Sequence, residues 1–94
     1  MVLVGQGILT DFAADHADVR SYIESWVAEI KSAKWQTPID LTARYPRADH
    51  VGEDRYVFDI KGRDYRLLAR VNFKNQIVRV LRIGTHAEYS KWKL

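Results

Sequence analysis

Residues 55–89 restrict the fold most strongly, because apolar and polar residues alternate there through three short runs. One face of the first two runs is apolar and consists of Tyr56, Phe58, Ile60, Tyr65, Leu67, Ala69, Val71 and Phe73. A period of two over this length is typical of β-strands. Turn-forming residues separate the runs at positions 61–64 and 74–76. The stretch therefore predicts an antiparallel meander with one apolar face and one polar face.

The polar face of the middle run carries Arg66, Leu68, Arg70 and Asn72. Two arginines on one side of a strand lie about 7 Å apart, a distance similar to that between neighbouring phosphates of a nucleic-acid strand. An isolated arginine is ordinary on a solvated sheet face. Here, however, the basic residues continue towards a last run that ends in Gly84-Thr85-His86. This arrangement favours a surface that binds a polyanion.

The charge distribution supports the same interpretation. Residues 1–60 contain six Lys/Arg and ten Asp/Glu, whereas residues 61–94 contain nine Lys/Arg and two Asp/Glu, for an overall net charge of +3. Concentrated positive charge in one half indicates a polyanionic partner. A membrane surface is the competing polyanion, but the basic residues fall on predicted strands and not on an amphipathic helix with aromatic residues. Nucleic acid is therefore favoured.

The length and composition predict one domain that spans residues 1–94 and has one modest core. The absence of cysteine excludes disulfides, thiolate nucleophiles and zinc–thiolate sites, and it fits a reducing cytoplasm. No apolar run reaches the ~20 residues that cross a bilayer, and the first residues do not resemble a signal peptide. We expect a cytoplasmic protein that does not associate with a membrane.

The remaining elements come before the meander. Val2–Val4 is expected to be a strand that joins it, and residues 8–16 are expected to be helical. The clearest helix carries one apolar stripe, which is made of Val19, Tyr22, Ile23, Trp26, Val27 and Ile30. Thr37-Pro38-Ile39-Asp40 predicts the start of a third helix, and residues 46–54 are expected to form an irregular loop. One strand, helices and then three strands predict an α+β domain.

The sequence contains no familiar catalytic motif. His16, His50 and His86 are not spaced as metal ligands, no glycine-rich loop could hold a phosphate, and no nucleophile motif is present. We therefore expect neither a metal nor a cofactor. Cleavage of RNA fits the residues that are present, because the ribose 2′-hydroxyl is an internal nucleophile. A protein must then remove the 2′ proton, neutralise the phosphate and protonate the 5′-oxygen.

Three residues are candidates for these tasks. Arg66 suits the phosphate, because a guanidinium keeps its charge and can bind two oxygens at once. His86 is a candidate for proton transfer, because histidine ordinarily titrates near neutral pH. Tyr89 would share a helical face with His86 and could stack on a base or donate a proton. The residues alone fit equally well with a structural His86 that is hydrogen-bonded to a loop carbonyl.

Several motifs resemble the HigB family of bacterial toxins, within the RelE/ParE-like superfamily of toxin–antitoxin systems. The motifs are D-L-T-A-R-Y-P at 40–46 followed by A-D at 48–49, Y-V-F-D-I at 56–60, Y-R-L at 65–67 and G-T-H-A-E-Y at 84–89. The resemblance extends from near Met1 to about Lys91. It implies a RelE-like fold, in which two helices pack on one face of a small antiparallel sheet.

The resemblance also implies an activity and partners. The activity is that of a metal-independent mRNA endoribonuclease, often acting on the translating ribosome. The partner is a HigA-like helix-turn-helix antitoxin, through which the complex binds operator DNA and represses its own operon. By position, Arg66 matches the arginine used on the scissile phosphate, His86 matches a basic or proton-transferring residue, and Tyr89 matches the family tyrosine.

Further basic residues are expected to contact RNA, namely Lys61, Arg63, Arg70, Lys74, Arg79, Arg82 and Lys91. Strict alternation would place Arg79 on the same side as Leu81 and Arg82 on the opposite side. This last strand differs from the family pattern, which often has a basic residue at the position of Leu81. Two alternatives to a nuclease therefore stay open: an inactive module that acts in operon repression, and a domain that only binds the antitoxin.

Overall fold

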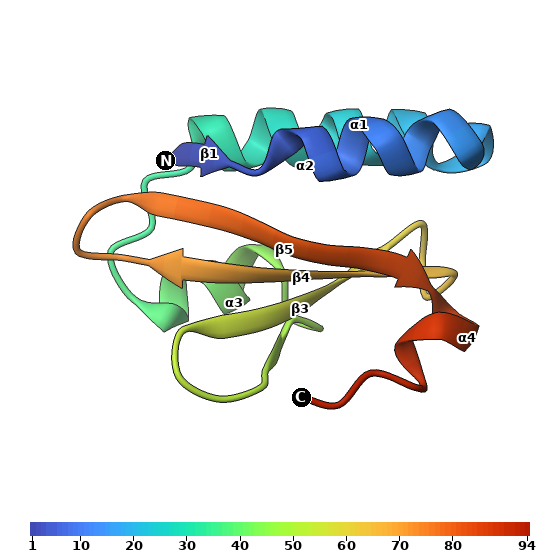
Figure 1. Cartoon of the computed structure of the whole chain (residues 1–94). Helices are drawn as coiled ribbons and strands as arrows, with labels where there is room; N and C mark the ends of the chain where they lie inside the picture. Colours follow the sequence, from blue (N-terminus) through green and yellow to red (C-terminus); the bar gives the residue numbers. More distant parts are fainter.

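The computed structural model describes all 94 residues as a twisted five-stranded sheet with three helices on one face and a short C-terminal helix at the other (Figure 1). The strands, in the spatial order β1-β5-β4-β3-β2, are β1 (Val2–Val4), β5 (Ile77–Thr85), β4 (Tyr65–Asn72), β3 (Arg55–Ile60) and β2 (Asp49–His50). The meander β3–β4–β5 is antiparallel, as predicted. β1 joins it, but its pairing with β5 is parallel. The sheet is therefore mixed. A parallel pair needs a crossover connection, and here the helices after β1 are part of it.

The helices are α1 (Gln6–Asp15), the short 3₁₀ helix η1 (Ala17–Val19), α2 (Arg20–Ser32), α3 (Pro38–Arg44) and the single turn α4 (His86–Tyr89). α3 begins as predicted, because the Asp40 carboxylate accepts the N–H groups of Gln36 at 2.8 Å and Thr37 at 3.3 Å. The region 46–54 is not wholly irregular, because β2 pairs there with β3. α1, α2 and α3 all contribute to one core.

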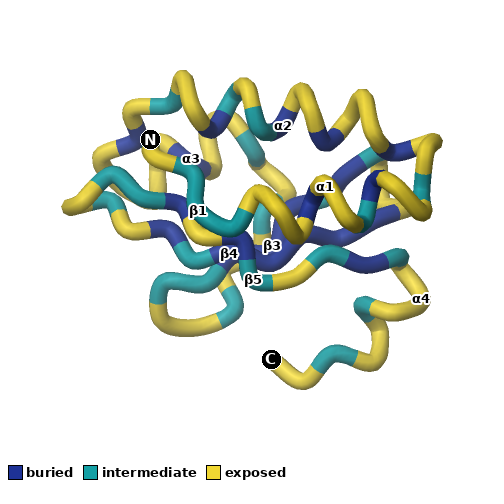
Figure 2. Tube along the Cα trace, turned by 45° about the horizontal axis from the view of Figure 1, so that its top comes forward, coloured by how far each residue is buried: buried dark blue, intermediate teal, exposed yellow.

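The core lies between these helices and the apolar face of the meander. Phe58 is fully buried, with ring centroids 5.4 Å from Trp26 of α2 and 5.3 Å from Tyr45 just after α3. Figure 2 shows the buried positions of α2 on its side towards the sheet. Tyr22 is an exception to the predicted stripe, because it is 48% exposed. The buried stripe is centred on Ile23, Trp26 and Ile30, which leaves Tyr22 at its margin.

A β-bulge in β5 changes which residues share the other face of the sheet. Leu68 of β4 pairs with Arg82, whereas the next residue, Ala69, pairs with Val80. Leu81 is therefore an extra residue that shifts the alternation by one position. As a result Arg79 and Arg82 lie on the same face, and the expectation that Arg82 points away from Arg79 is wrong.

We call the face of the meander turned away from α1, α2 and α3 the outer face. Its residues are Arg55, Val57, Asp59, Arg66, Leu68, Arg70, Arg79, Arg82 and Gly84. This face is less polar than predicted, because Val57 and Leu68 are 1% and 7% exposed and lie outside the main core. α4 and the C-terminal residues fold back onto the outer face, where Tyr89 and Trp92 contact Arg66 and Arg82.

Candidate nucleic-acid interface

Arg66 lies at the end of the outer face next to the β3–β4 turn, between Asp59 and Gly84, and is held from several sides. Its Nε is 3.1 Å from Asp59 Oδ1, its Nη1 donates to the Arg63 carbonyl at 2.6 Å, and its guanidinium carbon is 5.2 Å from the centre of the Tyr89 ring. The residue is only 7% exposed. Nη2 makes no hydrogen bond to the protein, and it is not fully buried. Nη2 is therefore the guanidinium nitrogen that is left for a phosphate oxygen.

The C-terminal residues cover Arg66 because Gly84 leaves room for them. A Cβ at Gly84 would lie 2.9 Å from the Trp92 ring and 3.2 Å from Glu88 Cβ. Trp92 in turn stacks edge-on against Tyr89, with centroids 5.4 Å apart, and lies 4.8 Å from the Arg82 guanidinium. The two aromatic rings and the two guanidinium groups thus form one continuous patch. Aromatic rings and guanidinium groups can both stack with bases.

His86 is exposed at the start of α4. Its backbone N–H donates to the Asp64 carbonyl at 2.9 Å, which fixes the helix start beside the β3–β4 turn. Thr85 caps α4, and Glu88 accepts the Thr85 N–H at 2.7 Å, which lowers the pKa of Glu88. No hydrogen bond or ion pair involves the His86 ring, so its imidazole is not fixed relative to Arg66.

The other predicted RNA contacts fall into two groups. Arg70, Arg79 and Arg82 lie on the outer face with Arg66. Arg79 and Arg82 are exposed and have no ion-pair partner, whereas Arg70 is bonded to Asp54. The predicted contacts outside the strands of this face are Lys61, Arg63, Lys74 and Lys91. Arg63 and Lys74 are exposed in turns at opposite ends of the sheet, and Lys91 is exposed near the C-terminus.

Lys61 is directed towards the helical layer. Its Nζ is 3.0 Å from Asp18 Oδ2 in η1, and the same carboxylate accepts the Tyr65 hydroxyl at 2.9 Å. These two hydrogen bonds lower the pKa of Asp18 below its ordinary value of 3.8. Lys61 therefore contributes to a contact between a turn and a helix, and the structure does not bring it to the outer face.

The Asp18 contact predicts a dependence of stability on pH. Because the pKa of Asp18 is lower in the folded chain than in the unfolded chain, its contribution is present above about pH 4 and is lost as the pH falls through the folded pKa. Asp18→Asn should reduce the loss of stability in this acidic window. Urea unfolding at pH 3 and at pH 6 measures the difference, and an unchanged pH dependence in the variant would contradict the assignment.

Sequence reasoning missed three residues of this interface, namely Asp59, Arg55 and Trp92. Asp59 faces Arg66 across the β3–β4 pair, and Arg55 faces Arg70. Both could have been found from the four-residue turn at 61–64, because that turn fixes the register of the two strands.

Comparison with known proteins places the chain among bacterial toxins. The profile of the HigB toxin family, described as the RelE-like toxic component of a toxin–antitoxin system, matches residues 19–92. The chain belongs to the HigB toxin family. It is 34% identical over 64 residues to the mRNA interferase HigB of Escherichia coli O6:H1, an alignment that covers 66% of this chain and 62% of that relative. It is 28% identical over 91 residues to the mRNA interferase toxin HigB of Escherichia coli K12, covering 95% and 88% of the two chains.

The HigB match extends from the end of η1 to Trp92, so it includes Asp59, Arg66, Tyr89 and the whole outer face. The α+β architecture, with helices on one face of a small sheet, agrees with the RelE-like fold that the family implies. None of the helices is both long and apolar enough to cross a bilayer. No three His, Asp or Glu side chains are grouped so that they could hold a metal ion.

Proposed function

We propose that this HigB-family chain is the toxin of a toxin–antitoxin system and acts as a metal-independent mRNA endoribonuclease. The observation that carries the proposal is the fixed guanidinium of Arg66 on a cationic sheet face, with Nη2 free of protein partners and an aromatic ring above it. Two curated relatives named as mRNA interferases support the same activity. The reaction is attack of the ribose 2′-hydroxyl on the adjacent phosphate, with departure of the 5′-oxygen.

Each residue has a task that its position supports. Arg66 donates Nη2 to the scissile phosphate and stabilises the charge that develops there, which is the role of a preorganised donor. Asp59 and the Arg63 carbonyl hold the guanidinium in place before RNA arrives. Arg82 and Arg79 contact neighbouring phosphates, and Tyr89 stacks on a base. His86, with its ring free, transfers a proton.

The family also directs the proposal to partners. We infer that a HigA-like helix-turn-helix antitoxin neutralises the toxin, and that contact with operator DNA is made only through the antitoxin. mRNA on the translating ribosome is the proposed substrate, which sets the site of action in the cytoplasm. An exposed cationic face suits this setting, because ribosome and message are both polyanions.

The test of the proposed function is cleavage of mRNA by the purified chain in the presence of EDTA, with and without ribosomes, scored as new 5′ ends. We expect cleavage to persist in EDTA. His86→Ala should lower the cleavage rate by about 10²–10⁴-fold, which is the usual contribution of a general acid or base. The exposed side chain makes no hydrogen bond or ion pair, so the variant should unfold at the same urea concentration as the parent chain.

Lys34→Ala is the matched control, because Lys34 is also exposed and lies between α2 and α3, away from the outer face. Its cleavage rate should equal that of the parent. Unchanged cleavage by His86→Ala would remove His86 from the mechanism, and RNA that is bound but left intact by the parent chain would contradict the nuclease.

One observation favours a second candidate function, that of a binding module in operon repression. Arg66 is 7% exposed beneath Tyr89, so a bulky phosphate has little access to it in this arrangement. Binding of RNA that weakens with salt, without any new 5′ ends even on ribosomes, would support this alternative.

A further inference from the structure

Three arginines lie side by side in one row across the outer face. Arg55 of β3 is directly opposite Arg70 of β4, and Arg70 is directly opposite Arg79 of β5. Neighbouring strands are about 4.8 Å apart, and like charges placed directly opposite each other destabilise a sheet. A row of this kind therefore requires negative charge from outside the strands.

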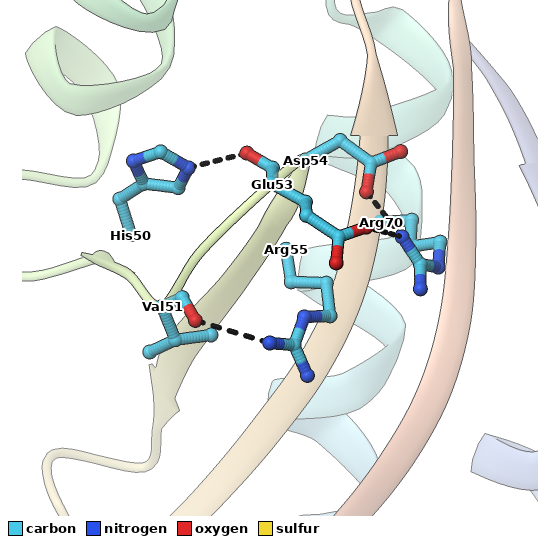
Figure 3. Close-up of polar contacts among 6 residues, drawn as sticks. All are labelled: His50, Val51, Glu53, Asp54, Arg55 and Arg70. Atoms are coloured by element: carbon cyan, nitrogen blue, oxygen red, sulfur yellow. Dashed lines mark hydrogen bonds and ion pairs between the residues drawn. The ribbon is translucent and has the colours of Figure 1, made fainter. Parts of the chain in front are cut away.

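The β2–β3 loop provides negative charge to Arg70, the middle arginine of the row (Figure 3). Arg70 Nη1 is 2.5 Å from Asp54 Oδ1 and 3.5 Å from Glu53 Oε2. Because these carboxylates stabilise the cation, the pKa of Arg70 is raised. Neither Arg55 nor Arg79 has a carboxylate partner.

The two outer arginines are open to a further ligand. Arg79 is exposed and makes no hydrogen bond or ion pair through its side chain. Arg55 donates through Nη2 to the Val51 carbonyl at 3.2 Å, while its Nε is buried and has no partner. A buried N–H without an acceptor is costly, so an anion that reached this atom would remove an existing penalty.

The backbone of the loop is fixed, because the Asp54 carbonyl accepts the Val71 N–H at 2.8 Å, but the Glu53 carboxylate is only a loose partner of Arg70. Gly52 and Glu53 have φ angles of 109° and 52°, and a left-handed conformation is uncommon for a residue such as glutamate. The Glu53 side chain is 74% exposed, and its 3.5 Å contact with Arg70 is long. Water surrounds most of this contact, so an exposed anion can replace it at small cost.

We propose that Arg55, Arg70 and Arg79 form a binding strip for RNA phosphates, and that Glu53 and Asp54 occupy the position of a phosphate in the free chain. The two carboxylate side chains are then internal competitors of RNA. They leave Arg70 when the RNA strand crosses β3, β4 and β5, while the loop backbone stays in place. This inference rests on the proposed function for the identity of the polyanion. It assigns the loop and Arg55 to RNA binding, in addition to the site around Arg66.

The experiment measures binding of a fluorescein-labelled 2′-O-methyl oligoribonucleotide to the full chain as a function of salt. Methylation blocks the internal nucleophile, so binding is measured whether or not the chain cleaves RNA. The double variant Glu53→Gln/Asp54→Asn should bind about tenfold more tightly at 50 mM salt. Its plot of log affinity against log salt should be steeper by about 0.7 for each additional phosphate that the variant neutralises.

The matched control is Asp11→Asn/Glu24→Gln, which changes the net charge equally at two exposed carboxylates of α1 and α2. Its affinity should change by less than about twofold at this distance from the outer face. Arg79→Gln should make the slope shallower by about 0.7. Equal increases in affinity in both double variants, or no increase in Glu53→Gln/Asp54→Asn, would overturn the proposal.

A single substitution serves as a second test in case the double variant does not fold. Glu53→Gln alone changes an exposed side chain and should raise the affinity in the same direction by a smaller factor. The proposed nuclease activity is tested separately, by cleavage of unmodified mRNA. If the chain is not a nuclease, cleavage is absent but the affinities for the methylated oligoribonucleotide are unaffected. The expected increase in affinity together with no cleavage of unmodified mRNA would therefore still support the strip, and would count only against the proposed nuclease.

Discussion

Replacing Arg66 with alanine is expected to lower the rate of mRNA cleavage by about 10²–10³-fold, the usual cost of removing one preorganised donor from a developing charge. The variant loses Nη2 as a phosphate donor, and it also leaves the Tyr89 ring without the guanidinium beneath it. Single-turnover cleavage of a defined mRNA fragment, with the chain in excess, measures this loss without a contribution from product release.

Arg66→Ala also leaves Asp59 as a carboxylate that is 18% exposed and has no cation, so we expect a stability loss of about 1–3 kcal/mol. Urea unfolding checks that the variant is folded under the assay conditions. Arg44→Ala is the matched control, because Arg44 is also paired with a carboxylate, Glu29, but belongs to α3. Cleavage that survives Arg66→Ala, or falls equally in Arg44→Ala, would remove Arg66 from the reaction.

Phe58→Ala is expected to lower the free energy of unfolding by about 3–5 kcal/mol. Phe58 is fully buried and packs edge-on against both Trp26 and Tyr45, so its removal opens a cavity where α2 and α3 meet the sheet. Small domains are stable by about 5–15 kcal/mol in total, so the effect is a large part of the whole. Urea denaturation followed by circular dichroism gives the value.

Ile39→Ala is the control for Phe58, because this large apolar side chain on α3 is 77% exposed. Its effect should stay within about 0.5 kcal/mol. A loss below about 1 kcal/mol in Phe58→Ala would mean that Trp26 and Tyr45 of the helical layer do not pack on β3.

The sequence predicted the secondary structure well where local chemistry determines it. The period-two runs became β3, β4 and β5, the Thr37-Pro38 start became α3, and Val2–Val4 joined the sheet. The predictions that failed concern features that depend on contacts between residues far apart in the sequence. Strict alternation placed Arg82 on the wrong face, because a bulge at Leu81 is set by the pairing of β4 with β5 and has no local signal here.

The candidate site was harder to predict than the fold. Arg66 and Tyr89 are brought together, but their contact requires the C-terminal residues to fold over Gly84, which no periodicity indicates. Lys61 was assigned to RNA on charge alone, whereas Asp18 lies 43 residues away in the sequence and attracts it to the helical layer. Charge composition predicts the sign of a surface, and the ion-pair partners decide which cations are free.

The central claim is that RNA binds the outer face across Arg66, beside Tyr89. The most direct measurement is an NMR titration of the ¹⁵N-labelled chain with the uncleavable 2′-O-methyl oligoribonucleotide. We predict shifts for the Arg66 side chain and for backbone amides of β4, β5 and α4, with α1 and α2 unaffected. Shifts confined to α1 and α2, with the Arg66 resonance unmoved at saturation, would contradict the claim.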